Sequence, residues 1–172
     1  MKLKTMLLCA ALISGAAFAA FAATTQTVTF TVTVPSVLEL TTTSNAVTLN
    51  LTASDYAGSD AILSEVAAAH QLAVRSNRAW VINVRSVTAN FAFTPSNAGD
   101  TRTKPSTDLS VRKAAGTYQT LSTSNVTLAS GTAGGVTHSG NTFDLDYRVA
   151  TDITLDPPGS YALDVLYTLT TP

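Results

Sequence analysis

The chain has 172 residues, of which 45% are hydrophobic and only 12% are charged, and its formal net charge is −1. This length is sufficient for one domain with a substantial hydrophobic core. The charge is nearly balanced and contains no basic cluster, which argues against partners such as nucleic acid or an anionic membrane surface.

Residues 1–22 have the composition of a secretory signal peptide: Lys2 and Lys4 precede an apolar stretch that ends in small residues. The apolar run is short for a membrane anchor, which is the alternative interpretation. Cleavage near Ala23 would remove Cys9, the single cysteine, so the mature chain would have no disulfide. It would keep eight basic and eleven acidic residues, a net charge of −3. We expect a secreted protein of the cell surface or an extracellular filament, with no integral membrane segment after processing.

The mature chain would begin with an alternating segment, TTQTVTFTVTVP at residues 24–35. Alternate side chains of a strand point to opposite faces, so this segment has an apolar face and a threonine face. The apolar face consists of Val28, Phe30, Val32 and Val34. We treat residues 23–36 as an N-terminal strand that pairs either with its own sheet or with a neighbouring copy, and residues 37–172 as one domain.

The central part of the chain is expected to form short strands at 37–40 and 46–51, and then a helical turn within 59–69. The segments 70–76 and 79–87 are separated by two residues, a spacing that favours a hairpin. Their apolar side chains should share one core, and we expect the aromatic residue among them, Trp80, to be buried there. Further strands are expected at 89–94, 108–114 and 126–130, with a polar surface loop at 95–106.

The last third has the clearest strand pattern. In TFDLDYRVA, at residues 142–150, apolar residues alternate with Asp144, Asp146 and Arg148. DPPGSY is expected to form a tight turn in which Gly159 adopts a positive φ. The closing strand places five apolar residues on one face: Tyr161, Leu163, Val165, Tyr167 and Leu169. Short strands separated by turns predict an all-β fold, a single immunoglobulin-like antiparallel β-sandwich, with a closed barrel as the alternative.

The sequence contains no recognisable catalytic constellation, so we expect no enzyme, no cofactor and no metal site. His70 is expected at a strand rim and His138 in a solvated turn. Asp144 and Asp146 lie on one strand face and could approach a cation. However, Ca²⁺ requires six to eight oxygen ligands, and Arg148 can neutralise the pair, so we expect a solvated outer face.

Both ends of the mature chain resemble the secreted sandwich subunits of bacterial fimbriae, the spore-coat-U-like and chaperone–usher pilins. The residues that carry this resemblance are TTQTVTFTVTVP and DPPGSYALDVLYTLT. In these families the N-terminal strand of one subunit fills a groove in the next. The resemblance implies that the apolar residues of 28–34 are inserted and that the five residues of the closing strand help to line the groove.

The resemblance also implies the partners: copies of the same chain, an assembly chaperone and an outer-membrane usher. The mature chain lacks the disulfide and the donor-strand glycine of many such subunits, so assembly without a chaperone is the alternative. We therefore expect a structural subunit of a pilus or surface filament. The competing hypothesis is a monomeric module that binds carbohydrate or protein through loop 95–106, with Tyr56 and Tyr118 as candidate contact aromatics.

Overall fold

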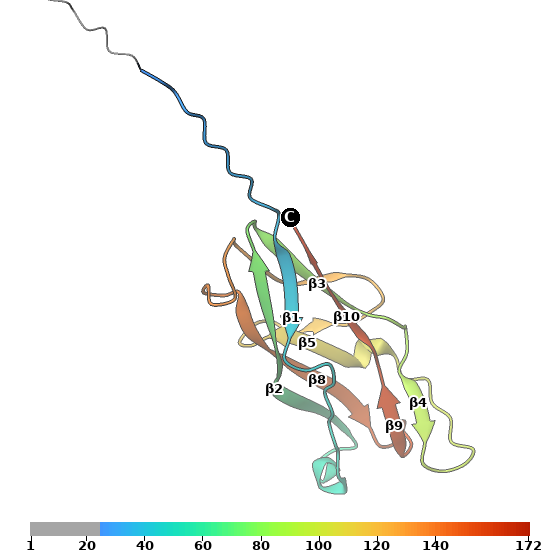
Figure 1. Cartoon of the computed structure of the whole chain (residues 1–172). Coiled ribbons are helices and arrows are strands. Elements are labelled where there is room, and N and C mark those ends of the chain that lie inside the picture. Colours follow the sequence, from blue (N-terminus) through green and yellow to red (C-terminus); the bar gives the residue numbers. More distant parts are fainter. Residues whose placement is uncertain (1–24) are drawn as a thin grey trace, which may run out of the picture. The chain divides into compact units, whose positions relative to one another are not determined.

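Figure 1 shows the computed structural model of the chain, which describes residues 25–172. The predicted signal peptide at 1–22 and the start of the 23–36 segment lie outside these residues. The described chain divides into an extended segment, residues 25–34, and a β domain that begins at Pro35. Within the described residues, no helix has the length and apolar character needed to cross a membrane.

The β domain contains ten strands and two single 3₁₀ turns, which confirms the prediction of an all-β fold. The strands are β1 (Leu38–Thr42), β2 (Ala61–Ser76), β3 (Trp80–Ser86), β4 (Ala92–Pro95), β5 (Leu109–Lys113), β6 (Gln119–Thr120), β7 (Val126–Gly131), β8 (Thr142–Asp152), β9 (Gly159–Ala162) and β10 (Val165–Thr170). The 3₁₀ turns are η1 (Ala53–Tyr56) and η2 (Ser106–Asp108).

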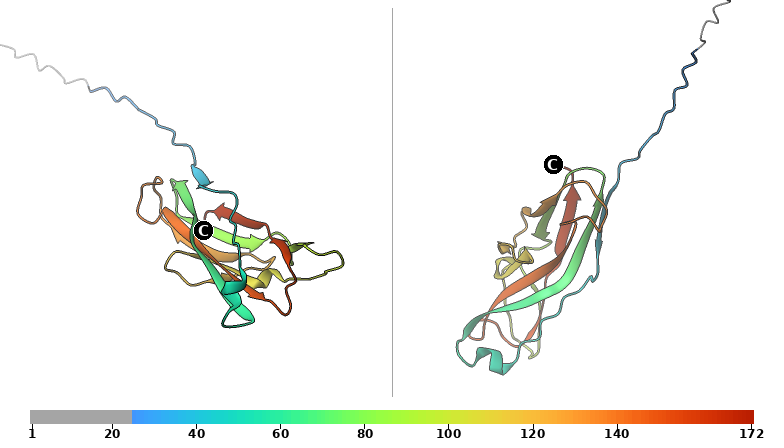
Figure 2. Two further views of the ribbon diagram at one scale, coloured as in Figure 1. Left: turned by 90° about the horizontal axis from the view of Figure 1, so that it is seen from below. Right: turned by 90° about the vertical axis from the view of Figure 1, so that its left-hand side faces the viewer.

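The strands form antiparallel sheets, consistent with a β-sandwich. One sheet has the order β1-β2-β8-β5-β6 and a second has the order β10-β3-β7. A two-stranded ribbon, β4-β9, continues the β3-β10 pair beyond an irregular stretch. Figure 2 shows that η1 lies at one end of the domain, while the β2–β3 corner and the C-terminus lie at the other end. We call these the turn end and the corner end.

The two main sheets bury the core between them. The core contains alternate residues of β2, β3, β5 and β8, each at most 9% exposed, together with Leu121 and Ala129. Trp80 is fully buried, as predicted, and its indole N–H lies 3.1 Å from the carbonyl oxygen of Thr132 and 3.2 Å from Oδ1 of Asn141. The indole therefore combines a large apolar contact area with a satisfied donor.

The predicted hairpin between 70–76 and 79–87 is wrong. β2 and β3 belong to different sheets, so the chain crosses the sandwich at the corner instead of folding back beside itself. The side chain of Asn77 holds this corner: its Nδ2 donates to the carbonyl of Pro35 at 2.7 Å, and its Oδ1 accepts from the amide of Val37 at 3.0 Å. The apolar residues of both segments still share one core, as expected, because β2 and β3 face each other across it.

The predicted helical turn at 59–69 is also wrong, because this segment forms the first half of β2. Residues Ile62, Val66 and Ala69 fit a helical stripe, but β8 offers a complete antiparallel partner from Ala61 to Val66. The register shifts between Val66 and His70, and Ala68 within this bulge has φ +48°. Pairing with a neighbouring strand thus overrides a weak helical preference.

Several segment boundaries differ from the prediction. Residues 46–51 form no ladder with any described strand, and the closing segment is divided into β9 and β10 at Leu163 and Asp164. Gly159 does not have the positive φ that was expected. Glycine is required at this position because a side chain would not fit. A Cβ there would lie 2.5 Å from the Phe93 ring and from the Thr94 carbonyl oxygen.

Gly131 provides a test of how tightly the sandwich is packed. A Cβ at this position would lie 2.3 Å from the Trp80 ring, whereas a Cβ at Gly135 would meet no atom within 4 Å. We expect Gly131→Ala to lower the free energy of unfolding by about 1–3 kcal/mol, the usual cost of overpacking a core. Urea denaturation of both variants would check this. An equal effect of Gly135→Ala would contradict the packing argument.

Candidate subunit interface

The closing strand presents its apolar residues on one side, although the strand is interrupted. Tyr161 in β9, Leu163 in the break, and Val165, Tyr167 and Leu169 in β10 are all partly buried, and the residues between them, from Ala162 to Thr168, are exposed. The three β10 side chains pack against the core. Because they lie at the border of the sandwich, their burial is incomplete. We call these five residues the apolar row.

The strand that carries this row has one free side. β10 pairs only with β3, and β9 only with β4, among the strands of the described residues. β1 is likewise the outermost strand of the five-stranded sheet, and Figure 1 shows it beside β10 at the border between the sheets. A strand edge of this kind leaves backbone N–H and C=O groups available for another strand.

A chain of hydrogen bonds links the two sheets at this border. Nδ1 of His70 lies 2.8 Å from the hydroxyl of Thr42, and Nε2 lies 2.8 Å from the hydroxyl of Tyr147. The Tyr147 hydroxyl in turn contacts that of Tyr167 in β10. His70 is only 8% exposed, so the expectation of a rim histidine is wrong, because the bulge in β2 turns this side chain into the sandwich.

The hydrogen bonds also define the protonation of the imidazole. The Thr42 hydroxyl donates to the carbonyl of Ser44 at 2.7 Å, so it accepts from His70, whose Nδ1 carries the proton. Nε2 is then an acceptor for the Tyr147 hydroxyl. A second proton on Nε2 would force that hydroxyl to reverse its hydrogen bond. Burial favours the neutral ring and lowers the pKa of His70 below its ordinary value of 6.5.

Burial also raises the pKa of both tyrosines, Tyr147 and Tyr167, so each remains a neutral hydroxyl near neutral pH. The chain of hydrogen bonds is therefore uncharged throughout. It satisfies the buried polar groups at the sheet border without placing a charge there.

The N-terminal segment, considered by itself, exposes its apolar face. Val28 and Phe30 are each 87% exposed, Val32 is 66% exposed and Val34 is 72% exposed. None of the described residues from 25 to 34 belongs to a strand ladder. Four large apolar side chains in a row are costly to leave in water, at roughly 1.5–3 kcal/mol for each side chain that could otherwise be buried.

The expectation of a solvated outer face on β8 is wrong at Asp146. This residue is 5% exposed, and its carboxylate accepts from the amide of Ala68 and from Nε of Arg112, each at 2.8 Å. The hydrogen bond from the Ala68 backbone and the ion pair with Arg112 hold the pKa of Asp146 below its usual range despite burial. Within the described residues there is no group of three or more potential metal ligands.

Tyr56 and Tyr118, the candidate contact aromatics of a binding module, make contacts within the chain. The guanidinium groups of Arg112 and Arg148 lie 4.4 and 4.1 Å from the centroid of the Tyr118 ring. Burial raises the pKa of Tyr118 to about 12. The hydroxyl of Tyr56 donates to Thr151 at 2.8 Å. His138, in contrast, is exposed in its turn, as expected.

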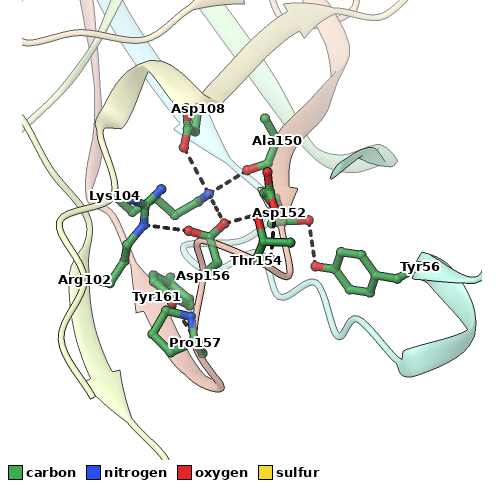
Figure 3. A network of polar contacts seen from close by, with 11 residues as sticks. Tyr56, Arg102, Lys104, Asp108, Ala150, Asp152, Thr154, Asp156, Pro157 and Tyr161 are labelled. Carbon is green, nitrogen blue, oxygen red and sulfur yellow. Dashed lines mark hydrogen bonds and ion pairs between the residues drawn. The ribbon is translucent and has the colours of Figure 1, made fainter. Parts of the chain in front are cut away.

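Loop 95–106 is anchored by an ion-pair network at the turn end, which Figure 3 shows. Nζ of Lys104, only 2% exposed, contacts carboxylate oxygens of Asp156 at 2.7 Å and Asp108 at 3.0 Å, and the carbonyl of Ala150 at 2.7 Å. Arg102 adds a second contact to Asp156 at 2.8 Å. A buried ammonium with three oxygen partners is satisfied, so this loop is tied to the β8–β9 turn.

No protein-family model matches the chain, and none of the curated proteins is significantly similar to it. The sheet edge and the exposed segment must therefore be interpreted from their own geometry and chemistry.

We expect the stability of the domain to fall as the pH decreases through 6.5. Because the pKa of His70 is lowered in the folded state, the unfolded chain binds more protons below 6.5, so the stabilisation is fully present above that pH and is lost below it. Urea denaturation at a series of pH values between 7.5 and about 5 would measure the slope. That range lies above the ordinary pKa of the carboxylates. His70→Gln should remove the slope, whereas His138→Gln should retain it. An unchanged slope in His70→Gln would refute the role of this side chain.

Proposed function

We propose that this protein is an extracellular structural subunit that polymerises into a pilus or surface filament. Each copy donates its N-terminal strand, residues 24–34, to the free side of β10 in a neighbouring copy. The observation that carries this proposal is that two features of the described chain each lack a partner strand. One is an exposed alternating strand that has no ladder in the described chain, and the other is an apolar row on a strand that is paired on one side only.

The two features are complementary in spacing. The donated strand carries four apolar residues at alternate positions from Val28 to Val34, and the apolar row carries five at alternate positions from Tyr161 to Leu169. In strand addition, main-chain hydrogen bonds supply affinity, and alternate side chains that enter the apolar layer supply specificity. The threonine face of the donated strand would remain toward water.

The competing hypothesis of a monomeric binding module has less support in the described residues. Tyr56 and Tyr118 are held by contacts within the chain, and loop 95–106 is tied down through Lys104. In addition, the apolar face of Phe30 and its neighbours is exposed in the described chain. The family resemblance adds an assembly chaperone and an outer-membrane usher as proposed partners of the filament subunit.

The donated strand can be tested with variants on its two faces. We expect Phe30→Asp to abolish filaments, because a carboxylate would have to enter an apolar layer on assembly. The matched control, Thr31→Asp, places the same charge on the threonine face and should leave filaments intact. Electron microscopy of material sheared from cells that express the full chain would compare the two variants with the parent.

Two outcomes would reject the proposal. One is a parent protein that stays monomeric and free of filaments at every concentration. The other is a Phe30→Asp variant that assembles as well as Thr31→Asp does, since the apolar face would then have no part in assembly.

A further inference from the structure

We propose a second contact between neighbouring copies: the hollow at the turn end of one copy receives the β2–β3 corner of the next. This inference rests on the proposed function and deepens it by naming a surface outside the donated strand. The contact consists of side chains, whereas strand donation depends on backbone pairing.

The hollow at the turn end has a volume of about 570 Å³ and lies beside the first residues of β2 and the last residues of β8. Its aliphatic part includes Ile62, Leu63 and Leu155. Leu63 is 64% exposed and Leu155 is 56% exposed, and the nearby Ile153 is 50% exposed. An apolar cluster with a charged border is the usual composition of a surface that contacts another protein.

The turn end of the domain, where this hollow lies, carries an excess of negative charge. The basic residues Lys104 and Arg102 are already balanced by Asp108 and Asp156. Three further carboxylates lie at this end without an ion pair to any described residue: Asp55, Asp60 and Asp152.

The opposite end has the complementary chemistry. At the corner, Arg75 pairs with Glu39 at 2.9 Å, but the exposed Arg78 has no acidic partner among the described residues. Leu38 and Val136 add apolar surface there, at 41% and 43% exposed. Opposite charge and apolar area at the two ends favour contact between unlike ends over contact between like ends.

The direction of the donated strand leads to the same arrangement. The chain leaves the domain at the corner end, where Asn77 holds Pro35, and β10 runs from Val165 toward the corner end at Thr170. A donated strand antiparallel to β10 would place Val34 near the turn end of the recipient. The corner of the donor would then face the hollow of the recipient. Such a contact between unlike surfaces can repeat from copy to copy and form an open filament instead of a closed ring. A parallel strand would instead bring like ends together.

The first residue of the apolar row lies close to a residue that lines the hollow. Nζ of Lys104, which lines the hollow, lies 5.9 Å from the ring centroid of Tyr161, the first residue of the row. A donated strand that reaches Tyr161 would therefore bring the β domain of the donor copy close to the hollow.

Engineered cysteines would test the contact, because the mature chain would have none of its own. The full chain would carry Arg78→Cys together with Leu155→Cys. These sites lie at opposite ends of β2, which spans about 50 Å at about 3.3 Å per residue, so they cannot join within one copy. After mild oxidation of filaments, we expect a ladder of disulfide-linked multimers on a denaturing gel. The control pair Thr168→Cys with Leu155→Cys should give no ladder, since Thr168 lies on the outer side of β10.

The outcomes separate this inference from the proposed function. Filaments that form but give no ladder would overturn the end-to-end contact and leave strand donation standing. A parent chain that forms no filaments would overturn both. If the cysteine variants do not fold, a charge exchange replaces them: Asp60→Arg should shorten the filaments, and adding Arg78→Asp should restore their length. Failure of that restoration would also overturn the contact.

Discussion

The crossing of the chain at Asn77 determines how the rest of the sandwich can form. The side chain of this residue binds the backbone on both sides of Ser36, so β1 and the β2–β3 corner are held together. The chain then enters the second sheet with Trp80 buried instead of returning beside β2. Because β2 and β3 face each other, their apolar sides meet and form the core. Because of the same crossing, β3 pairs only with strands that come much later in the sequence.

That late completion explains why the second sheet has an open side. β3 pairs with β7 on one side and β10 on the other, so three strands cover a core that five strands cover from the opposite side. The uncharged chain from His70 through Tyr147 to Tyr167 closes part of the border between the sheets with polar groups. The remaining apolar row is less buried than the core, because no described strand lies beyond it.

Alternation of residues predicted the core and several of the strands, but not which strands pair. Leu72, Val74 and Trp80 lie in one core as their pattern indicates, yet the pattern cannot show whether adjacent strands pair or cross. Short segments are ambiguous in period, which is why 59–69 fits a helical stripe although it forms a strand. Residues 46–51 alternate as a strand does but have no partner in the described chain, and pairing, not alternation, makes a strand.

In the candidate interface, too, some features can be predicted from the sequence and others depend on the fold. The apolar faces at 28–34 and 161–169 could be identified from the sequence, whereas the free side of β10 depends on the order of strands in the sheet. The burial of His70 depends on a bulge that no local pattern indicates. The ion pair of Lys104 with Asp156 joins residues that are 52 positions apart, so only the folded chain brings them together.

The pairing of β3 with β10 also has a consequence for how fast the domain can fold. Val84 pairs with Tyr167, so this ladder must close a loop of about 80 residues, and such non-local contacts slow folding. During synthesis from the N-terminus, β3 is complete long before β10 exists. Until then, the apolar side chains of β3 lack their partner strand. During this interval the exposed apolar surface makes the chain prone to aggregate.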